Sequence, residues 1–288
     1  MTDIPALLAL ASAFLFALSI QVQNLGLALV DSRSGVLVNI GVTALMYWVL
    51  SPFFIESGYW LTEAAFLFAL VGLFRPALSI NLSVAGVKHM GPTLTSGLAA
   101  TAPIITAFFA IALLDEVLTL PIAIGTVGVI AGIVLTAIKP AGGQPRGWPL
   151  WAMLLPLGAA FFRAVGYPVT MIGFKELPDA FFAGLVSYSV SLLVALSIFK
   201  IQRRIFADFS WGYGWFALAG LINGISIYSL NTALKFGQLL TVAPIVACSP
   251  LFTMLMGWLI FKREIITWRM VMSISLMISG IIVVVTQS

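Results

Sequence analysis

The sequence predicts an all-α integral membrane protein in which ten transmembrane helices form two inverted five-helix repeats. Three observations predict this fold class. The 288 residues are 61% hydrophobic and only 8% charged, whereas a soluble domain carries about 25% charged residues. The apolar residues form ten runs, each close to the roughly 20 residues that a helix needs to cross a bilayer. The second half of the chain also repeats the first.

Charged, Gly-rich and Pro-rich stretches separate the ten apolar runs. The runs place crossings at residues 4–29, 35–55, 63–87, 92–114, 119–138, 149–173, 180–200, 211–234, 239–261 and 267–286. The first run resembles a signal peptide but lacks a basic start, so we expect it to remain as a membrane helix. Little of the chain is left for an extramembrane domain.

The two halves match when one is shifted over the other by about 147 residues. Lys88 then meets Lys235, and Pro103 meets Pro250. The predicted domains are a first five-helix repeat at 1–138, a linker at 139–148 and a second five-helix repeat at 149–288. Because five is odd, the second repeat enters the membrane from the opposite side, as in many secondary transporters.

Basic residues in the short loops predict the orientation, because they favour the cytoplasmic side. One side carries Arg33, Lys88, Lys139, Arg146, Lys200, Arg203, Arg204, Lys262, Arg263 and Arg269, and the other carries Lys175 and Lys235. We therefore expect a multi-pass protein of the cell inner (plasma) membrane with both termini outside the cytoplasm. The expected partners are the lipid bilayer and a small-molecule substrate, without nucleic acid, and a monomer would suffice.

The residue types predict no cofactor, no metal site and no enzyme. The single cysteine, Cys248, and the single histidine, His89, lack the companions that a metal or catalytic site needs. An intramembrane enzyme acting on lipid-linked substrates would need a carboxylate pair, an activated nucleophile or metal ligands. That alternative is disfavoured, and a non-transporting scaffold would leave two membrane arginines unexplained.

Those two residues, Arg75 and Arg163, lie near the centres of the third and sixth predicted crossings. A charge at the bilayer centre costs at least roughly 2.5 to 3.5 kcal/mol, so it should face a partner or a water-filled cavity. All ten carboxylates lie at predicted helix ends or in loops. Two interpretations stay open. Backbone carbonyls freed near Pro76 and Pro168 could satisfy the guanidinium groups, or an anionic group of a substrate could do so.

Polar helix faces predict a substrate path. Arg163, Tyr167 and Thr170 share one face of the sixth crossing. The expected substrate-binding residues are Arg163, Arg75, Tyr167, Ser79, Asn223, Tyr228, Asn231 and Gln23. Hinges or helix breaks are expected at Pro103, Pro244, Pro250 and Pro168.

Two further features predict structural roles. Gly128 and Gly132 in the fifth crossing, and Ser275 and Ser279 in the tenth, have the spacing that lets membrane helices pack closely. Small-residue packing is also the alternative explanation for any single Ser or Gly of the polar faces. Glu116 and Glu264, at the ends of the fourth and ninth crossings, are expected to cap helices at the interface rather than to carry protons.

Each half carries the same loose motif, which consists of a mid-membrane proline, an acidic residue followed by an apolar pair and Thr, and a Gly-bearing helix. The motif reads Ala102-Pro103, Asp115-Glu116-Val117-Leu118-Thr119 and Gly132, then Ser249-Pro250, Glu264-Ile265-Ile266-Thr267 and Gly280. Over essentially the whole chain, this pattern resembles the EamA-type repeat of the drug/metabolite transporter superfamily. The resemblance implies a central cavity framed by helices one, three, four, six, eight and nine, with helices five and ten peripheral.

The expected function is export of small metabolites, foremost aromatic or other neutral amino acids, by alternating access through that cavity. Aromatic amino-acid exporters are one branch that the resemblance includes. An arginine would meet the substrate carboxylate, and Tyr167 and Tyr228 would contact its side chain. A drug or toxic-cation efflux carrier is the alternative. It is disfavoured because the small multidrug members of the superfamily use a membrane glutamate, and this chain has no equivalent.

Overall fold

The structure is a computed structural model that describes residues 3–137, 149–202, 210–260 and 267–286, apart from the side chains of residues 3, 91–93, 96, 136 and 137. Within these ranges every regular element is a helix. The bounds are α1 Asp3–Gly26, α2 Ser32–Phe54, η1 Ser57–Leu61, α3 Glu63–Phe74, α4 Ala77–Ala99, α5 Ala102–Leu114, α6 Leu120–Ala137, η2 Leu150–Met153, α7 Leu154–Glu176, α8 Ala180–Ile201, α9 Trp211–Phe236, α10 Leu239–Ala247, α11 Ser249–Leu259 and α12 Trp268–Thr286.

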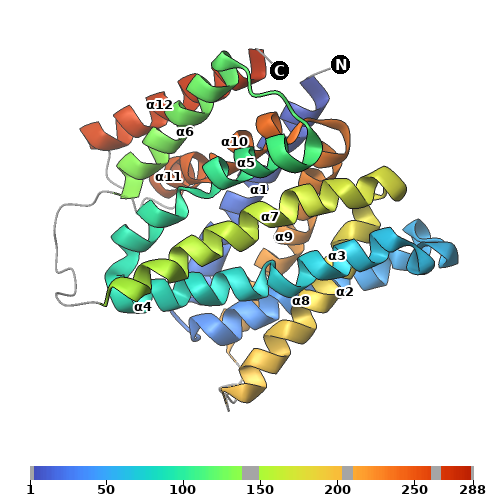
Figure 1. Cartoon of the computed structure of the whole chain (residues 1–288). Helices are drawn as coiled ribbons and strands as arrows, with labels where there is room; N and C mark the ends of the chain where they lie inside the picture. The colour runs from blue at the N-terminus through green and yellow to red at the C-terminus, as the bar shows by residue number, and fades with distance from the viewer. Residues whose placement is uncertain (1–2, 138–148, 203–209, 261–266, 287–288) are drawn as a thin grey trace.

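The all-helical membrane fold is confirmed. Nine segments of the described chain are long and apolar enough to cross a membrane, and Leu120–Leu135 in α6 is a shorter apolar helix. The start of α1 and the end of α12 lie at the same end of the molecule (Figure 1), as an even number of crossings requires. The expected linker at 139–148 lies outside the described residues.

The third crossing is not the continuous helix that the sequence predicted. Helix α3 ends at Phe74, Arg75 has extended backbone angles (φ −124°, ψ 131°), and α4 begins at Ala77. Pro76 explains the break, because proline has no N–H and disfavours the helical conformation in the residue before it. Helix α4 then runs on through residues 88–91, where a loop was expected, and ends at Ala99. The break therefore frees Arg75 from a helix face.

The two halves pack against each other in corresponding ways. Helix α1 packs along α9, and their repeat counterparts, α7 and the α3–α4 pair, pack together as well. Helix α2 packs on α8, and α6 packs on α12, each with its own counterpart. Figure 1 shows α6 and α12 side by side at one edge of the molecule. With α6 and α12 at the edge, the remaining helices surround the centre.

The α6–α12 contact is close enough for backbones to touch. A Cβ on Gly280 would lie only 2.6 Å from the carbonyl oxygen of Gly125. The hydroxyl of Ser273 donates a hydrogen bond of 2.6 Å to a glycine carbonyl of α6. The expected pair, Ser275 and Ser279, is instead exposed, so that prediction was wrong. The spacing was suitable, but α12 is rotated so that Ser273 and Gly280 face α6.

Two glutamates cap helices of the opposite half. The Glu116 carboxylate accepts hydrogen bonds of 2.6 and 2.8 Å from the N–H groups of Leu239 and Leu240, in the first turn of α10. Glu176, at the end of α7, accepts from two N–H groups in the first turn of α3. The first turn of a helix has free N–H groups and the positive end of the helix dipole, so a carboxylate stabilises it. Glu116 is therefore a cap, as expected, and its counterpart Glu264 lies outside the described residues.

We expect Glu116→Gln to lower the free energy of unfolding by about 1–2 kcal/mol at mildly acidic pH. The amide nitrogen cannot accept a hydrogen bond, so one backbone N–H of α10 would lose its partner. Thermal unfolding of the purified protein in detergent measures the effect. Glu56→Gln is the control, because Glu56 is exposed and its side chain makes no cap hydrogen bond. Equal unfolding temperatures for wild type and Glu116→Gln would contradict the cap.

The pH dependence of this contribution follows from the environment of the carboxyl group. Burial raises the pKa of Glu116 above its usual value of 4.5, and the hydrogen bonds from Leu240 and Leu239 offset part of the rise. Because folding raises the pKa of Glu116, the folded protein binds this proton more tightly than the unfolded chain does. The protonated carboxyl group therefore stabilises the fold, and its contribution is lost as the pH rises through the raised pKa. The stability difference between wild type and Glu116→Gln should therefore shrink with rising pH. A difference that grows with pH would contradict this sign.

Candidate functional site

A cavity of about 590 Å³ lies at the centre of the molecule, between the two halves. This volume is typical of sites for small molecules, which are mainly apolar with a few placed polar groups. Helices α1 to α5 and α7 to α11 line it, α6 contributes Ile133, and no described residue of α12 reaches it. The helices that the family resemblance implied are all present. Helices α2 and α8 extend the wall beyond that expectation.

The structure brings most of the expected binding residues together. The cavity is lined by Arg163, Arg75, Tyr167, Ser79, Asn223, Asn231 and Gln23. Tyr228 does not line it, because its side chain is 42% exposed and its ring lies 6.4 Å from that of Phe181. Five residues of helix separate Tyr228 from Asn223, which turns the side chain by about 140°. Tyr228 is therefore removed from the candidate site.

The side chain of Arg75 lies against the neighbouring helix α7. Its guanidinium carbon is 4.4 Å from the centre of the Tyr167 ring, in a cation–π contact. Gly166 provides the space, because a Cβ there would lie 2.6 Å from Cδ of Arg75. The extended backbone at Arg75 lets the side chain reach this position. A cation–π contact holds the charge without using its N–H donors, which leaves them for a ligand.

Arg163 lies one helical turn before Tyr167, on the same face of α7. Its Nε is buried and has no hydrogen-bond partner among the described residues. On α2, Asn39 is only 6% exposed, and its Nδ2 also lacks a partner there. In the part of the chain that the structure describes, no aspartate or glutamate lines the cavity. Because a buried donor without an acceptor is costly, these groups favour a ligand that supplies acceptor atoms.

The other polar residues of the cavity bond mainly to the protein itself. Asn223 donates a hydrogen bond of 2.8 Å to the hydroxyl of Tyr188, and Asn231 donates one of 3.1 Å to a backbone carbonyl of α8. Ser79 donates to the carbonyl of Pro76, directly before its own helix. These hydrogen bonds hold the side chains of the cavity wall in place. Arg163 and Asn39 thus remain as lining residues that have a buried donor atom without a partner in the described chain.

The expected hinge prolines differ in position. Pro103 and Pro250 lie in the first turns of α5 and α11, directly after the interruptions of the fourth and ninth crossings, and both line the cavity. Pro244 lies inside α10 and does not line the cavity, and the helix ends three residues later. Helix α7 continues through Pro168, so this proline is not a break. A single missing N–H is tolerated because the hydrogen bonds of the flanking turns persist.

The sequence reasoning missed the contributions of α2 and α8. Asn39 and Tyr188 line the cavity but were not singled out. A signal existed in both cases, because Asn39 interrupts an apolar run that begins at Val36, and Tyr188 lies in the polar stretch 187–191. Such a signal shows that a residue is unusual within a membrane helix, but it does not show which side of the helix faces the cavity.

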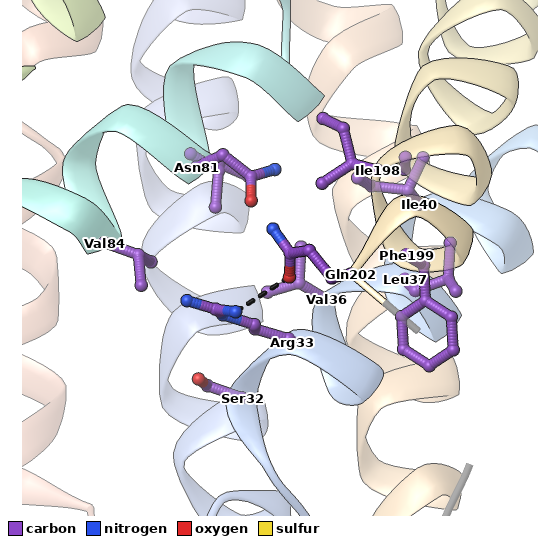
Figure 2. A pocket seen from close by; sticks show the side chains of 12 residues that line it. Ser32, Arg33, Val36, Leu37, Ile40, Asn81, Val84, Ile198, Phe199 and Gln202 are labelled. Carbon is purple, nitrogen blue, oxygen red and sulfur yellow. Dashed lines mark hydrogen bonds between the residues drawn. The ribbon is translucent and has the colours of Figure 1, made fainter. Parts of the chain in front are cut away.

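A second, small pocket of about 40 Å³ lies between α2, α4 and α8. Figure 2 shows Arg33 and Gln202 facing each other there, and Arg33 donates a hydrogen bond of 2.7 Å to the side-chain oxygen of Gln202. Val36, Ile40 and Val84 line both this pocket and the large cavity. The small pocket has room for about one water molecule. It is therefore a small polar pocket, separated from the large cavity by aliphatic side chains, and it is too small to be a second substrate site.

Two five-helix halves around a central cavity, with interrupted helices beside it, define a secondary membrane transporter. The sequence profile of the EamA-like transporter family matches residues 3–138 and 150–286, one match in each half. The chain belongs to this family of the drug/metabolite transporter superfamily, and members of the family are transporters rather than enzymes.

A protein of known crystal structure has a similar fold, with a TM-score of 0.78 at 13% sequence identity. The alignment covers 97% of this chain and 95% of that one. At this identity the likeness concerns the fold alone. No curated protein matches the chain.

Proposed function

We propose that the protein exports small metabolites that carry a carboxylate or another anionic group, a class that includes amino acids. One observation carries the proposal: Arg75 and Arg163 both line the central cavity, and none of the described residues that line it with them is acidic. An anionic group would supply the acceptors that the buried Nε of Arg163 lacks. A cationic drug would be repelled by the same two charges, so the efflux of toxic cations is disfavoured.

The cavity walls support a solute with an apolar part. Phe16, Phe68 and Tyr188 line the cavity together with Tyr167, so an aromatic or aliphatic side chain would find contacts there. The interruptions before Pro103 and Pro250 occur at corresponding places in the two halves. Paired interruptions of this kind allow the halves to rock or bend around a central site. We therefore propose alternating access as the mechanism.

We also propose the orientation that the basic loops favour, with the protein in the plasma membrane and both termini outside the cytoplasm. A reporter that is active only in the cytoplasm, fused after Ser288, should be inactive, and the same reporter fused after Lys200 should be active. An active reporter at the C-terminus would contradict the proposed orientation.

Solute release from proteoliposomes tests the proposed function. Vesicles are loaded with labelled phenylalanine, 3-phenyllactate, aspartate or malate. The uncharged amides of the two hydroxy acids, 3-phenyllactamide and malamide, are the matched probes without a carboxylate. We expect protein-dependent release of the hydroxy acid and the amino acid of at least one skeleton. Release of the amides should not exceed their release from protein-free vesicles. Equal protein-dependent release of an acid and its amide would show that the carboxylate is not recognised.

A further inference from the structure

The charges around the central cavity are all of one sign. Among the described residues that line it, Arg75 and Arg163 are the only charged side chains, and none is aspartate, glutamate, lysine or histidine. The cavity wall therefore carries two positive charges. A carboxylate could balance one of them, but an ammonium group on the same solute would add a third positive charge to the same space.

The two positive charges lie on one wall. At the repeat offset of 147 residues, Arg163 corresponds to Phe16, and Arg75 corresponds to Ile222. The counterparts on α1 and α9 are thus uncharged, and the cationic wall is formed by the α3–α4 break and α7. The guanidinium group of Arg75 rests on the ring of Tyr167, and Tyr167 follows Arg163 by one helical turn on α7. A solute bound between them meets the field of both.

The hydrogen-bonding capacity of the cavity is also one-sided. The Nε of Arg163 and the Nδ2 of Asn39 are buried donors without partners among the described residues. The hydroxyl groups of Thr106, Thr170 and Ser187 already donate to carbonyls of their own helices. The unused groups are therefore mostly N–H donors, which require acceptor atoms. A solute ammonium brings only further donors.

From this one-sided charge and donor pattern, we propose that the cavity selects solutes with a net negative charge, so that hydroxy acids and dicarboxylates are carried in preference to amino acids of the same skeleton. This inference rests on the proposed function, and it narrows the substrate class within it. The ammonium of an amino acid lies one carbon away from the carboxylate, so it cannot leave the field of the arginines. In a cavity of low dielectric that repulsion is weakly screened. A hydroxyl at the same position carries no charge and can also accept a hydrogen bond.

The matched pairs of 3-phenyllactate with phenylalanine, and of malate with aspartate, test the inference, because each pair differs only by hydroxyl against ammonium. We expect kcat/KM for release from proteoliposomes to be at least tenfold higher for the hydroxy acid in each transported pair. Because both members are measured on the same preparation, the ratio does not depend on the fraction of folded protein. An amino acid carried as well as its hydroxy acid would overturn the inference.

Two variants test the electrostatic cause. Arg75→Gln removes one positive charge, so the ratio of hydroxy acid to amino acid should fall several-fold. Asn39→Asp keeps the shape of the side chain and places a counter-charge in the cavity, so the ratio should fall further, with faster transport of the amino acid itself. Lys175→Gln, on the exposed end of α7, is the charge-matched control and should leave the ratio unchanged. An unaltered ratio in both cavity variants would overturn the inference.

The two proposals fail in different ways. If acids and their amides are released equally, the proposed function fails, and the selectivity inference fails with it. If the acids alone are released but the amino acid equals the hydroxy acid, the proposed function stands and only the inference is overturned.

Discussion

Arg163→Gln is expected to lower the transport of carboxylate-bearing solutes per folded molecule by about tenfold to a hundredfold. A hydrogen bond to a charged group is worth about 1.5–3 kcal/mol, which corresponds to this range. The Nε of Arg163 is buried at the cavity without a partner in the described chain, so the structure offers the group to a ligand. Arg163→Lys should cause a smaller loss, because lysine keeps the charge but cannot form the two parallel hydrogen bonds of a guanidinium group.

The measurement is the initial rate of solute release from proteoliposomes, divided by the amount of monodisperse protein. Lys175→Gln removes a positive charge from the exposed end of the same helix and should keep the wild-type rate. A wild-type rate in well-folded Arg163→Gln would assign this arginine to structure. The proposed function would then depend on Arg75 and the polar faces of the cavity.

Gly280→Leu is expected to destabilise the protein by about 3 kcal/mol and to reduce the yield of monodisperse protein. Even the first added atom, Cβ, would lie 2.6 Å from the oxygen of Gly125 and 2.9 Å from the nitrogen of Val129. Both are backbone atoms of α6, so they cannot move aside as a flexible side chain could. The two helices would have to separate, which would lose the contact on which α12 depends.

Ser279→Leu provides the matched control for this variant. Ser279 is the preceding residue, and it is exposed on the outer side of α12, where a leucine would face lipid. Thermal unfolding in detergent should therefore give a wild-type temperature for Ser279→Leu and a clearly lower one for Gly280→Leu. The reverse order would mean that the face of α12 that packs on α6 has been assigned incorrectly.

The sequence by itself determined the fold class, because the bilayer imposes strong constraints on composition. A chain that is 61% hydrophobic and 8% charged cannot cover a water-facing surface, and only closed hydrogen-bonding structures such as helices are tolerated in lipid. The internal repeat was also readable from residues such as Pro103 and Pro250. Charged residues are rare in membrane helices because they are costly there, so Arg75 and Arg163 could be identified as candidate functional residues from the sequence.

Only the tertiary structure decided which groups share the cavity. Helical spacing says which residues lie on one face, but the rotation of each helix about its axis depends on packing with its neighbours. Tyr228 therefore points outward, while Asn39 and Tyr188 point inward. The break at Arg75 had the largest effect, because it turned a residue of one helix face into a partner of Tyr167 on another helix. Such a contact joins residues far apart in the chain, and local sequence carries no information on their distance.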